Sequence, residues 1–199
     1  MSSITARELG IMNNEKSKIT ATRHVNVFAE LSHGNGVLLE NAKERRPGYH
    51  YETLASVIMA AFKFEAFLNH IGFLVLPFWS AIERLPHKNK LEILATHLNV
   101  EIDSGKRPFQ TLTALFQARD GIAHGKPELI ETVAIKDGLP NELDAEKPQT
   151  KWESICTLEF AERAYEDTEQ IAVLFWNASG LDTLEFRRNG FSYSISSIQ

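Results

Sequence analysis

The sequence predicts an all-α fold: an up-and-down bundle of four to six helices, with a long irregular loop before the last main helix. Apolar residues recur at i, i+3, i+4 spacing in several segments, and no series of alternating strands is present. Of the 199 residues, 43% are hydrophobic, which suits one domain with a single core. We expect the helices that follow Leu54, Pro108 and Thr157 to form the centre of that core.

The N-terminal part of the chain is polar, and residues 1–18 are expected to form a flexible arm. A helical spacing of apolar residues then extends from Thr22 to Lys43, but Gly34 and Gly36 interrupt it. Because a glycine costs about 1 kcal/mol in a helix interior, one bent helix or two short helices would both fit this segment.

The longest predicted helix begins near Leu54 and ends before Pro77. Its periodic residues are all apolar (Leu54, Val57, Ile58, Ala61, Phe64, Leu68, Ile71 and Val75). The longest unbroken apolar run is too short to cross a bilayer, so we expect a core helix and no membrane contact. Shorter helices are expected over Ser80–Leu85 and Lys88–Leu98.

The helix that begins near Pro108 has an apolar seam beside a polar face. One charged residue, Arg119, lies in that seam (Phe109, Leu112, Leu115, Phe116, Arg119, Ile122 and Ala123). Because a charged group among core residues requires a partner, we expect Arg119 to be paired, and Glu65 on the preceding helix is a candidate. Gly125 and Pro127 end the helix.

Helical periodicity is lost after Pro127 and returns at Thr157. The intervening residues 127–153 contain scattered charges and prolines, and we expect a long surface loop. The last main helix begins at Thr157 and ends at Gly180. The sequence therefore predicts a helical domain over residues 19–180 and a short C-terminal tail over residues 181–199.

Composition argues against several kinds of site. Cys156 is the only cysteine, so the chain can form neither a disulfide framework nor a cysteine-based zinc site. No two histidines share i, i+3 or i, i+4 spacing and no phosphate-cradling glycine loop occurs, so we expect no metal and no cofactor. Five of the seven histidines are assigned ordinary surface or core roles (His24, His50, His70, His87 and His97). A reducing cytoplasm fits best, and at a net charge of −5 any nucleic-acid binding has to be local.

The segment RDGIAH, from Arg119 to His124, resembles the R-(polar)-x(3–5)-H signature of the HEPN superfamily. The helix that carries FEAFLN (Phe64–Asn69) before it, and a further helix after it, also resemble that fold over roughly residues 51–180. Members of the superfamily are all-α domains, and many are metal-independent endoribonucleases of toxin–antitoxin, phage-defence and RNA-processing systems. The resemblance implies an HEPN-like bundle that acts on RNA, with an antitoxin or another protein as a candidate partner.

Cleavage of RNA without a metal requires proton transfer and a cation near the phosphate. A histidine transfers protons near neutral pH, and a guanidinium stabilises the charge that the phosphate gains in the transition state. The resemblance therefore implies His124 as the acid/base and Arg119 as the phosphate clamp. Asp120 lies four residues before His124 on the same helical face, where it could orient the imidazole.

Other polar residues complete the predicted site. Those expected to bind substrate are Lys126, Arg107, Lys63 and Gln117. Those expected to support the motif as structural partners are Glu65 and Asn69. Residues five apart on a helix diverge by about 140°, so Arg119 and His124 of one chain do not converge on one phosphate. A two-fold homodimer would gather two copies of each, and the resemblance also implies an active cleft at a homodimer interface.

Two other functions fit the same residues. A histidine in the last helical turn, followed by Gly125, Lys126 and Pro127, is also what an ordinary helix end uses to satisfy its carbonyls. The chain would then be a catalytically inactive module for dimerisation or for partner or nucleotide binding. Asp120 favours this alternative, because many active members carry a neutral Asn there. The third candidate is a bundle that binds a small molecule or nucleotide.

Overall fold

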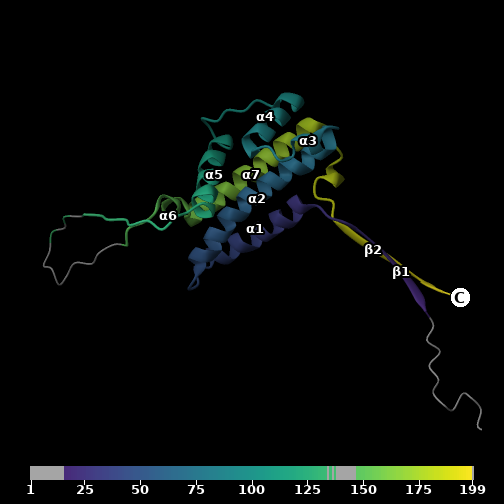
Figure 1. Cartoon of the computed structure of the whole chain (residues 1–199), viewed down its shortest axis with the longest axis horizontal. Helices are drawn as coiled ribbons and strands as arrows, with labels where there is room; N and C mark the ends of the chain where they lie inside the picture. The colour runs from purple at the N-terminus through teal and green to yellow at the C-terminus, as the bar shows by residue number, and fades with distance from the viewer. Residues whose placement is uncertain (1–15, 134, 136, 138–146, 199) are drawn as a thin grey trace, which may run out of the picture. The chain divides into compact units, whose positions relative to one another are not determined.

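The computed structural model describes residues 16–133, 135, 137 and 147–198. The chain divides into two compact units: a helical unit from Asn26 to Arg187, and a β-ribbon formed by the residues that flank it. Figure 1 labels the elements of both units. The prediction of a helical fold is confirmed for the helical unit, but the all-α class is incomplete, because two strands occur in the segments that flank that unit.

The first two helices, α1 (Val27–Lys43) and α2 (Tyr49–Val75), lie side by side (Figure 1). Of the two alternatives for the first segment, a single continuous helix is correct. Asn35, between the two glycines of α1, is fully buried and accepts a hydrogen bond from Ser56 Oγ on α2 at 2.7 Å. This contact with α2 helps to offset the low helix propensity of the glycines.

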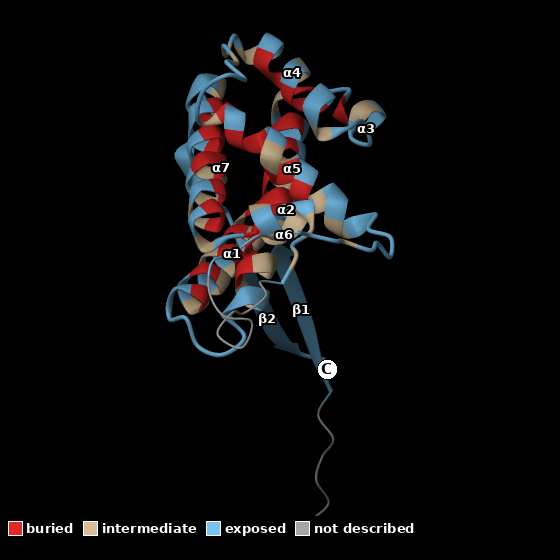
Figure 2. Cartoon of the chain, turned by 90° about the vertical axis from the view of Figure 1, so that its left-hand side faces the viewer, coloured by how far each residue is buried: buried red, intermediate tan, exposed pale blue. Residues whose placement is uncertain are grey.

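The core lies where α2, α5 (Phe109–Ala123) and α7 (Leu158–Ser179) pack together, as the apolar periodicity predicts. Figure 2 shows that the buried residues of these helices face one another. Fully or almost fully buried residues on the three helices include Val57, Phe64, Leu68, Leu115, Phe116, Ile171 and Phe175. The short helix α3 (Trp79–Ile82) and helix α4 (His87–Leu98) complete this unit at one end of α2.

The predicted loop before the last main helix contains a short helix that the sequence analysis missed. This helix, α6 (Lys151–Ile155), begins with a capping box in which Thr150 and Glu153 exchange hydrogen bonds. It packs against the end of α5, where the Trp152 side chain lies beside Gly121. Residues 127–133 contain no helix or strand, as predicted, and residues 138–146 lie outside the described part of the chain.

The helical unit extends beyond the boundary predicted at residue 180. A single 3-10 turn, η1 (Thr183–Glu185), follows α7. The Phe186 ring then packs against Phe28 and Trp176, with centroid separations of 5.3 and 4.9 Å. Because this aromatic side chain joins the core, the unit ends at Arg187, and the predicted tail is shorter than expected.

The second unit is a two-stranded antiparallel ribbon. Strand β1 (Ser17–His24) pairs with β2 (Gly190–Ser197), and Ile19 lies opposite Ile195. The predicted helix start at Thr22 is therefore wrong, because Thr22 lies in β1. Local periodicity missed the ribbon because each strand gains its hydrogen bonds from a segment at the other end of the chain. The arm expected over residues 1–18 lies outside the described residues up to residue 15.

Helix α2 is long and apolar enough to cross a membrane by length and composition alone. However, half of its apolar window is buried inside the protein. A buried core helix meets the same criteria of length and composition, so α2 is only weak evidence for a membrane span.

Candidate functional site

Arg119 lies on α5 between the core and a group of polar side chains. Its Nη2 atom lies 3.7 Å from Glu65 Oε2 on α2, which confirms the predicted pairing. Its guanidinium also lies over the Phe116 ring, 5.2 Å from the centroid. The Nε atom is 3.2 Å from Asp120 Oδ1, but this contact lacks hydrogen-bond geometry, and the buried Nε has no hydrogen-bond partner among the described residues. The guanidinium is therefore charge-paired without being saturated by hydrogen bonds.

His87, at the start of α4, belongs to the same group. Its ring stacks on Phe116 with a centroid separation of 3.4 Å and an interplanar angle of 6°. Burial lowers the pKa of His87 below its ordinary value; the negative charges of Glu65 and Asp120 oppose this shift, and the positive charge of Arg119 adds to it. Sequence reasoning assigned His87 an ordinary role, because it lies in a different segment from the motif and no spacing rule connects the two.

Lys90, one turn after His87, is buried beneath this group. Its ammonium donates to Asn69 Oδ1 at 3.1 Å and to the Glu83 carbonyl at 3.2 Å. Burial lowers the pKa of Lys90, and the charge of Glu65 opposes that shift. The structural partner of Asn69 is therefore Lys90, whereas Glu65 holds Arg119. We call Glu65, Asn69, His87, Lys90, Arg119 and Asp120 the Arg119 cluster.

His124 is the residue that ends α5. Its backbone N–H donates to the Asp120 carbonyl at 2.9 Å, and the residue is exposed. The carboxylate of Asp120 contacts Arg119, and within the described residues no hydrogen bond or ion pair joins it to the His124 imidazole. Within the chain the motif therefore presents its arginine in the cluster and its histidine at an exposed helix end. The predicted orientation of His124 by Asp120 is not found.

Two of the predicted substrate-binding residues are occupied elsewhere in the fold. Lys63 is fully buried, and its ammonium binds Glu169 at 3.0 Å and lies over the Tyr165 ring, 4.2 Å from the centroid. Burial lowers the pKa of Lys63 to about 8, against the opposing charge of Glu169. A fully buried ammonium cannot reach a phosphate in solution, so the substrate-binding role assigned to Lys63 is wrong. The apolar neighbours of Lys63 in the sequence are the only signal that could have indicated this burial.

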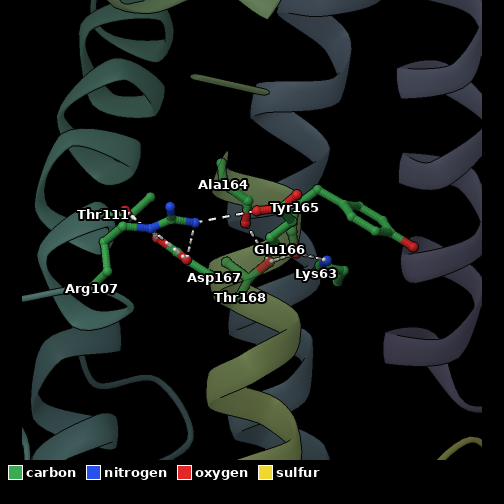
Figure 3. Close-up of polar contacts among 8 residues, drawn as sticks. All are labelled: Lys63, Arg107, Thr111, Ala164, Tyr165, Glu166, Asp167 and Thr168. Atoms are coloured by element: carbon green, nitrogen blue, oxygen red, sulfur yellow. Dashed lines mark hydrogen bonds and ion pairs between the residues drawn. The ribbon is translucent and has the colours of Figure 1, made fainter. Parts of the chain in front are cut away.

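Arg107 forms a bidentate pair with Asp167 of α7. Figure 3 shows the guanidinium facing that carboxylate, with Thr111 donating to the same group. The Nε and Nη2 atoms of Arg107 lie 2.7–3.0 Å from the Asp167 oxygens, and Nη2 also reaches Glu166 at 3.3 Å. This pairing fixes the start of α5 against α7, so the structure gives Arg107 a structural role. Lys126 and Gln117 are exposed, as residues that bind a ligand from solution need to be.

An exposed apolar stripe follows α2 on the face that carries Glu65. Tyr51, Phe62 and Phe73 are 73%, 46% and 74% exposed, and Asn69 is exposed between the two phenylalanines. Residues at these spacings share one side of an α-helix. The Arg119 cluster is therefore bordered along α2 by large apolar side chains that the described part of the chain leaves uncovered.

The described residues contain no group of three or more His, Cys, Asp or Glu side chains that could hold a metal ion. Cys156 is buried, and this burial raises the pKa of its thiol to about 11. A thiol of that kind is a poor nucleophile at neutral pH.

No protein-family model, no curated protein and no solved structure matches the chain. The arginine, the two imidazoles and the carboxylates described above therefore carry the functional argument. Together they can bind an anion through Arg119 and transfer protons through His87 or His124.

Proposed function

We propose that the protein is a metal-independent, HEPN-like endoribonuclease that acts as a homodimer in the cytoplasm, as a toxin or defence component. The observation that carries this proposal is the guanidinium of Arg119, held by Glu65 beside an imidazole without being saturated by hydrogen bonds. The substrate would be single-stranded or looped RNA, whose bases are accessible to a protein. An antitoxin or another protein would control the activity.

The chemistry follows from the residue types. The RNA 2′-hydroxyl attacks the adjacent phosphorus and loses a proton, while the departing 5′-oxygen gains one. Arg119 stabilises the negative charge on the phosphoryl oxygens, and His124 serves as acid/base. A reaction that both removes and delivers a proton requires a second group or a second role for the first. In a dimer the partner's motif supplies it, and His87 is a further candidate because burial favours its neutral, proton-accepting form.

The exposed stripe on α2 supports the homodimer. Burying the rings of Tyr51, Phe62 and Phe73 against a second copy would stabilise association, since aromatic side chains dominate interface energetics. The stripe borders Glu65, so a two-fold axis near it would bring two Arg119 clusters towards each other. Phe62→Glu combined with Phe73→Glu is expected to shift the protein from dimer to monomer in light scattering. A dimer that persists in this variant would exclude the stripe as the interface.

The inactive module is the second candidate function, and one observation favours it. Arg119 is paired with two carboxylates, and only 23% of its side chain is exposed. A phosphate would have to approach beside Glu65 and Asp120, which repel it. In this case the α2 stripe would dock a partner protein, and neither imidazole would affect RNA.

The test is cleavage of mixed RNA in the presence of EDTA. His124→Ala is expected to lower the rate roughly 100-fold or more, as loss of a general acid/base does. Arg119→Ala is expected to lower it by a similar factor, through loss of transition-state charge stabilisation. His97→Ala, an exposed histidine on α4, is the matched control and should retain the wild-type rate. Cleavage that survives both motif substitutions, or that EDTA abolishes, would refute the proposal.

A further inference from the structure

His87 presents a flat ring whose plane is fixed by the core. Its imidazole lies parallel to the Phe116 ring, with a centroid separation of 3.4 Å and an interplanar angle of 6°. Phe116 is only 3% exposed, so the ring that supports the imidazole belongs to the core. A side chain held in this way loses little further conformational freedom when a ligand contacts it, which favours binding.

The face of the imidazole that points away from Phe116 is available to a ligand. His87 is half-buried and Phe116 covers one side of its ring, so solvent reaches the ring through its edge and its other face. Within the described residues the imidazole has no hydrogen bond, no ion pair and no second ring contact. The fold therefore positions this ring and leaves its outer face without a partner.

The neighbour of His87 in the cluster adds a group that binds anions. The guanidinium of Arg119 lies 5.2 Å from the centroid of the same Phe116 ring. Burial lowers the pKa of His87, so the imidazole is neutral near pH 7 and the phosphate contact comes from Arg119. Because both groups are held against one ring, a flat surface and an anion-binding group lie within the span of a single nucleotide.

We propose that His87 is a stacking platform for a nucleobase of the RNA strand, whose adjoining phosphate binds Arg119. Bases of single-stranded RNA are recognised by stacking on aromatic side chains, histidine among them. A purine offers a larger flat surface than a pyrimidine, so a purine is expected to be preferred at this position. The stack of Phe116, His87 and the base would fix the strand relative to Arg119.

The identification of the ligand as substrate RNA rests on the proposed nuclease function, whereas stacking on His87 does not. A free purine nucleotide carries the same base and phosphate, so probes of different length distinguish the two sources. An RNA strand is expected to bind more tightly than a mononucleotide, because its further phosphates and bases add contacts. Duplex RNA keeps its bases inside the helix and should bind more weakly than a single strand.

The binding test uses the full chain, fluorescein-labelled 2′-O-methyl oligoadenosine and oligouridine, and fluorescence anisotropy. Neither probe has a free 2′-hydroxyl, so the proposed chemistry cannot cleave them. Wild type should bind oligoadenosine more tightly than oligouridine. His87→Ala is expected to weaken oligoadenosine binding roughly 10-fold and to reduce this preference. The exposed histidine variant His97→Ala is the matched control and should bind as wild type.

Two further variants separate stacking from packing on Phe116. His87→Phe keeps a flat ring and should bind oligoadenosine as tightly as wild type. His87→Leu covers Phe116 with an apolar side chain but has no flat face, so it should remain folded and lose affinity as His87→Ala does. This pair also decides the question if His87→Ala does not fold.

Nuclear magnetic resonance gives a direct readout of the stack. The ring protons of His87, assigned by their absence from the spectrum of His87→Phe, should move upfield when adenosine 3′-monophosphate is added. Inorganic phosphate has no base and should not produce this upfield shift. A mononucleotide that binds as tightly as the oligonucleotide would assign the platform to a free nucleotide and overturn its role in holding RNA.

Unchanged affinity in His87→Ala and His87→Leu would overturn the proposal, as would a wild-type protein that binds neither probe. Loss of affinity in His87→Phe equal to that in His87→Leu would overturn it too, because the ring would then not act by stacking. The proposed nuclease function fails separately. Probe binding that depends on His87 in a protein that cleaves no RNA would refute the nuclease alone, whereas cleavage that depends on His124, with binding indifferent to His87, would refute the platform alone.

Discussion

The helical unit contains two groups of paired charges that differ in how completely they are satisfied. On α7, Asp167 and Glu169 each receive several donors: Arg107 and Thr111 bind Asp167, while Lys63, Ser32 and Arg187 bind Glu169. At the end of α5, Arg119 is held by a 3.7 Å contact to Glu65 and by a contact to Asp120 that lacks hydrogen-bond geometry.

This difference in hydrogen bonding distinguishes charged groups that stabilise the fold from charged groups that can bind a ligand. A buried charge group whose donors and acceptors are all matched stabilises one arrangement and has no capacity left for a ligand. A guanidinium with unsatisfied donors retains that capacity, at the cost of a weaker contribution to stability. By this criterion the residues paired with Asp167 and Glu169 of α7 hold helices together, whereas the Arg119 cluster is the group suited to a ligand.

The largest stability effect expected from this comparison is that of Lys63→Ala. Removing the ammonium leaves the Glu169 carboxylate with fewer partners and opens a cavity between α2 and α7. Together these effects are expected to lower the free energy of unfolding by about 3 kcal/mol. Urea denaturation at pH 7 measures this loss of stability. The rate of RNA cleavage per folded molecule of Lys63→Ala should not change.

Arg119→Ala is the matched contrast to Lys63→Ala. The partly exposed Arg119–Glu65 pair is expected to contribute no more than about 1 kcal/mol to stability. Arg119→Ala should therefore abolish most of the activity and leave the urea midpoint nearly in place. If the two variants exchanged these phenotypes, the division between a structural and a functional group would be wrong.

The sequence predicted the features of the fold and of the candidate site that depend on local periodicity. The seam of α5 placed Arg119 among core residues, and a charge in that position requires a partner, which is Glu65 as predicted. The sequence could not distinguish Lys63 from a surface lysine, because both periodicity and composition allow a long basic side chain to reach solvent from a helix. Lys63 can be buried because α7 places the carboxylate of Glu169 opposite its ammonium.

The features that sequence reasoning missed depend on contacts between distant segments. His87 joins Arg119 only because the fold places the start of α4 beside α5, with the imidazole on the Phe116 ring. The ribbon forms only when residues 17–24 meet residues 190–197. Phe186 likewise extends the helical unit through its contacts with aromatic side chains of α1, α2 and α7. None of these pairings leaves a periodic signal within one segment.

A smaller effect is expected in the pH dependence of stability. The pKa of Lys63 is about 8 in the folded protein, below the ordinary value of 10.5 that it has when unfolded. Between these values the unfolded chain binds more protons than the folded one, so stability rises with pH through this window. The expected gain from pH 8 to 10 is on the order of 2 kcal/mol. Urea denaturation of wild type and Lys63→Met isolates the contribution, which should be absent from the variant.

The smallest effect is expected for the cleavage rate of His87→Phe. This variant tests whether the position of His87 beside Arg119 is functional. A phenylalanine ring can stack on Phe116 as the imidazole does, but it cannot accept or donate a proton. His87→Phe should therefore leave the urea midpoint nearly unchanged. If the neutral imidazole accepts a proton during cleavage, the variant should be slowed roughly 10-fold, below the range for a principal acid/base because His124 remains. Because burial lowers the pKa of His87, the acidic limb that His87 contributes to the pH–rate profile should lie below the pH at which an unperturbed histidine titrates, and this limb should be lost in the variant. An unchanged pH–rate profile in His87→Phe would restrict proton transfer to His124 and leave His87 as a packing residue for Arg119.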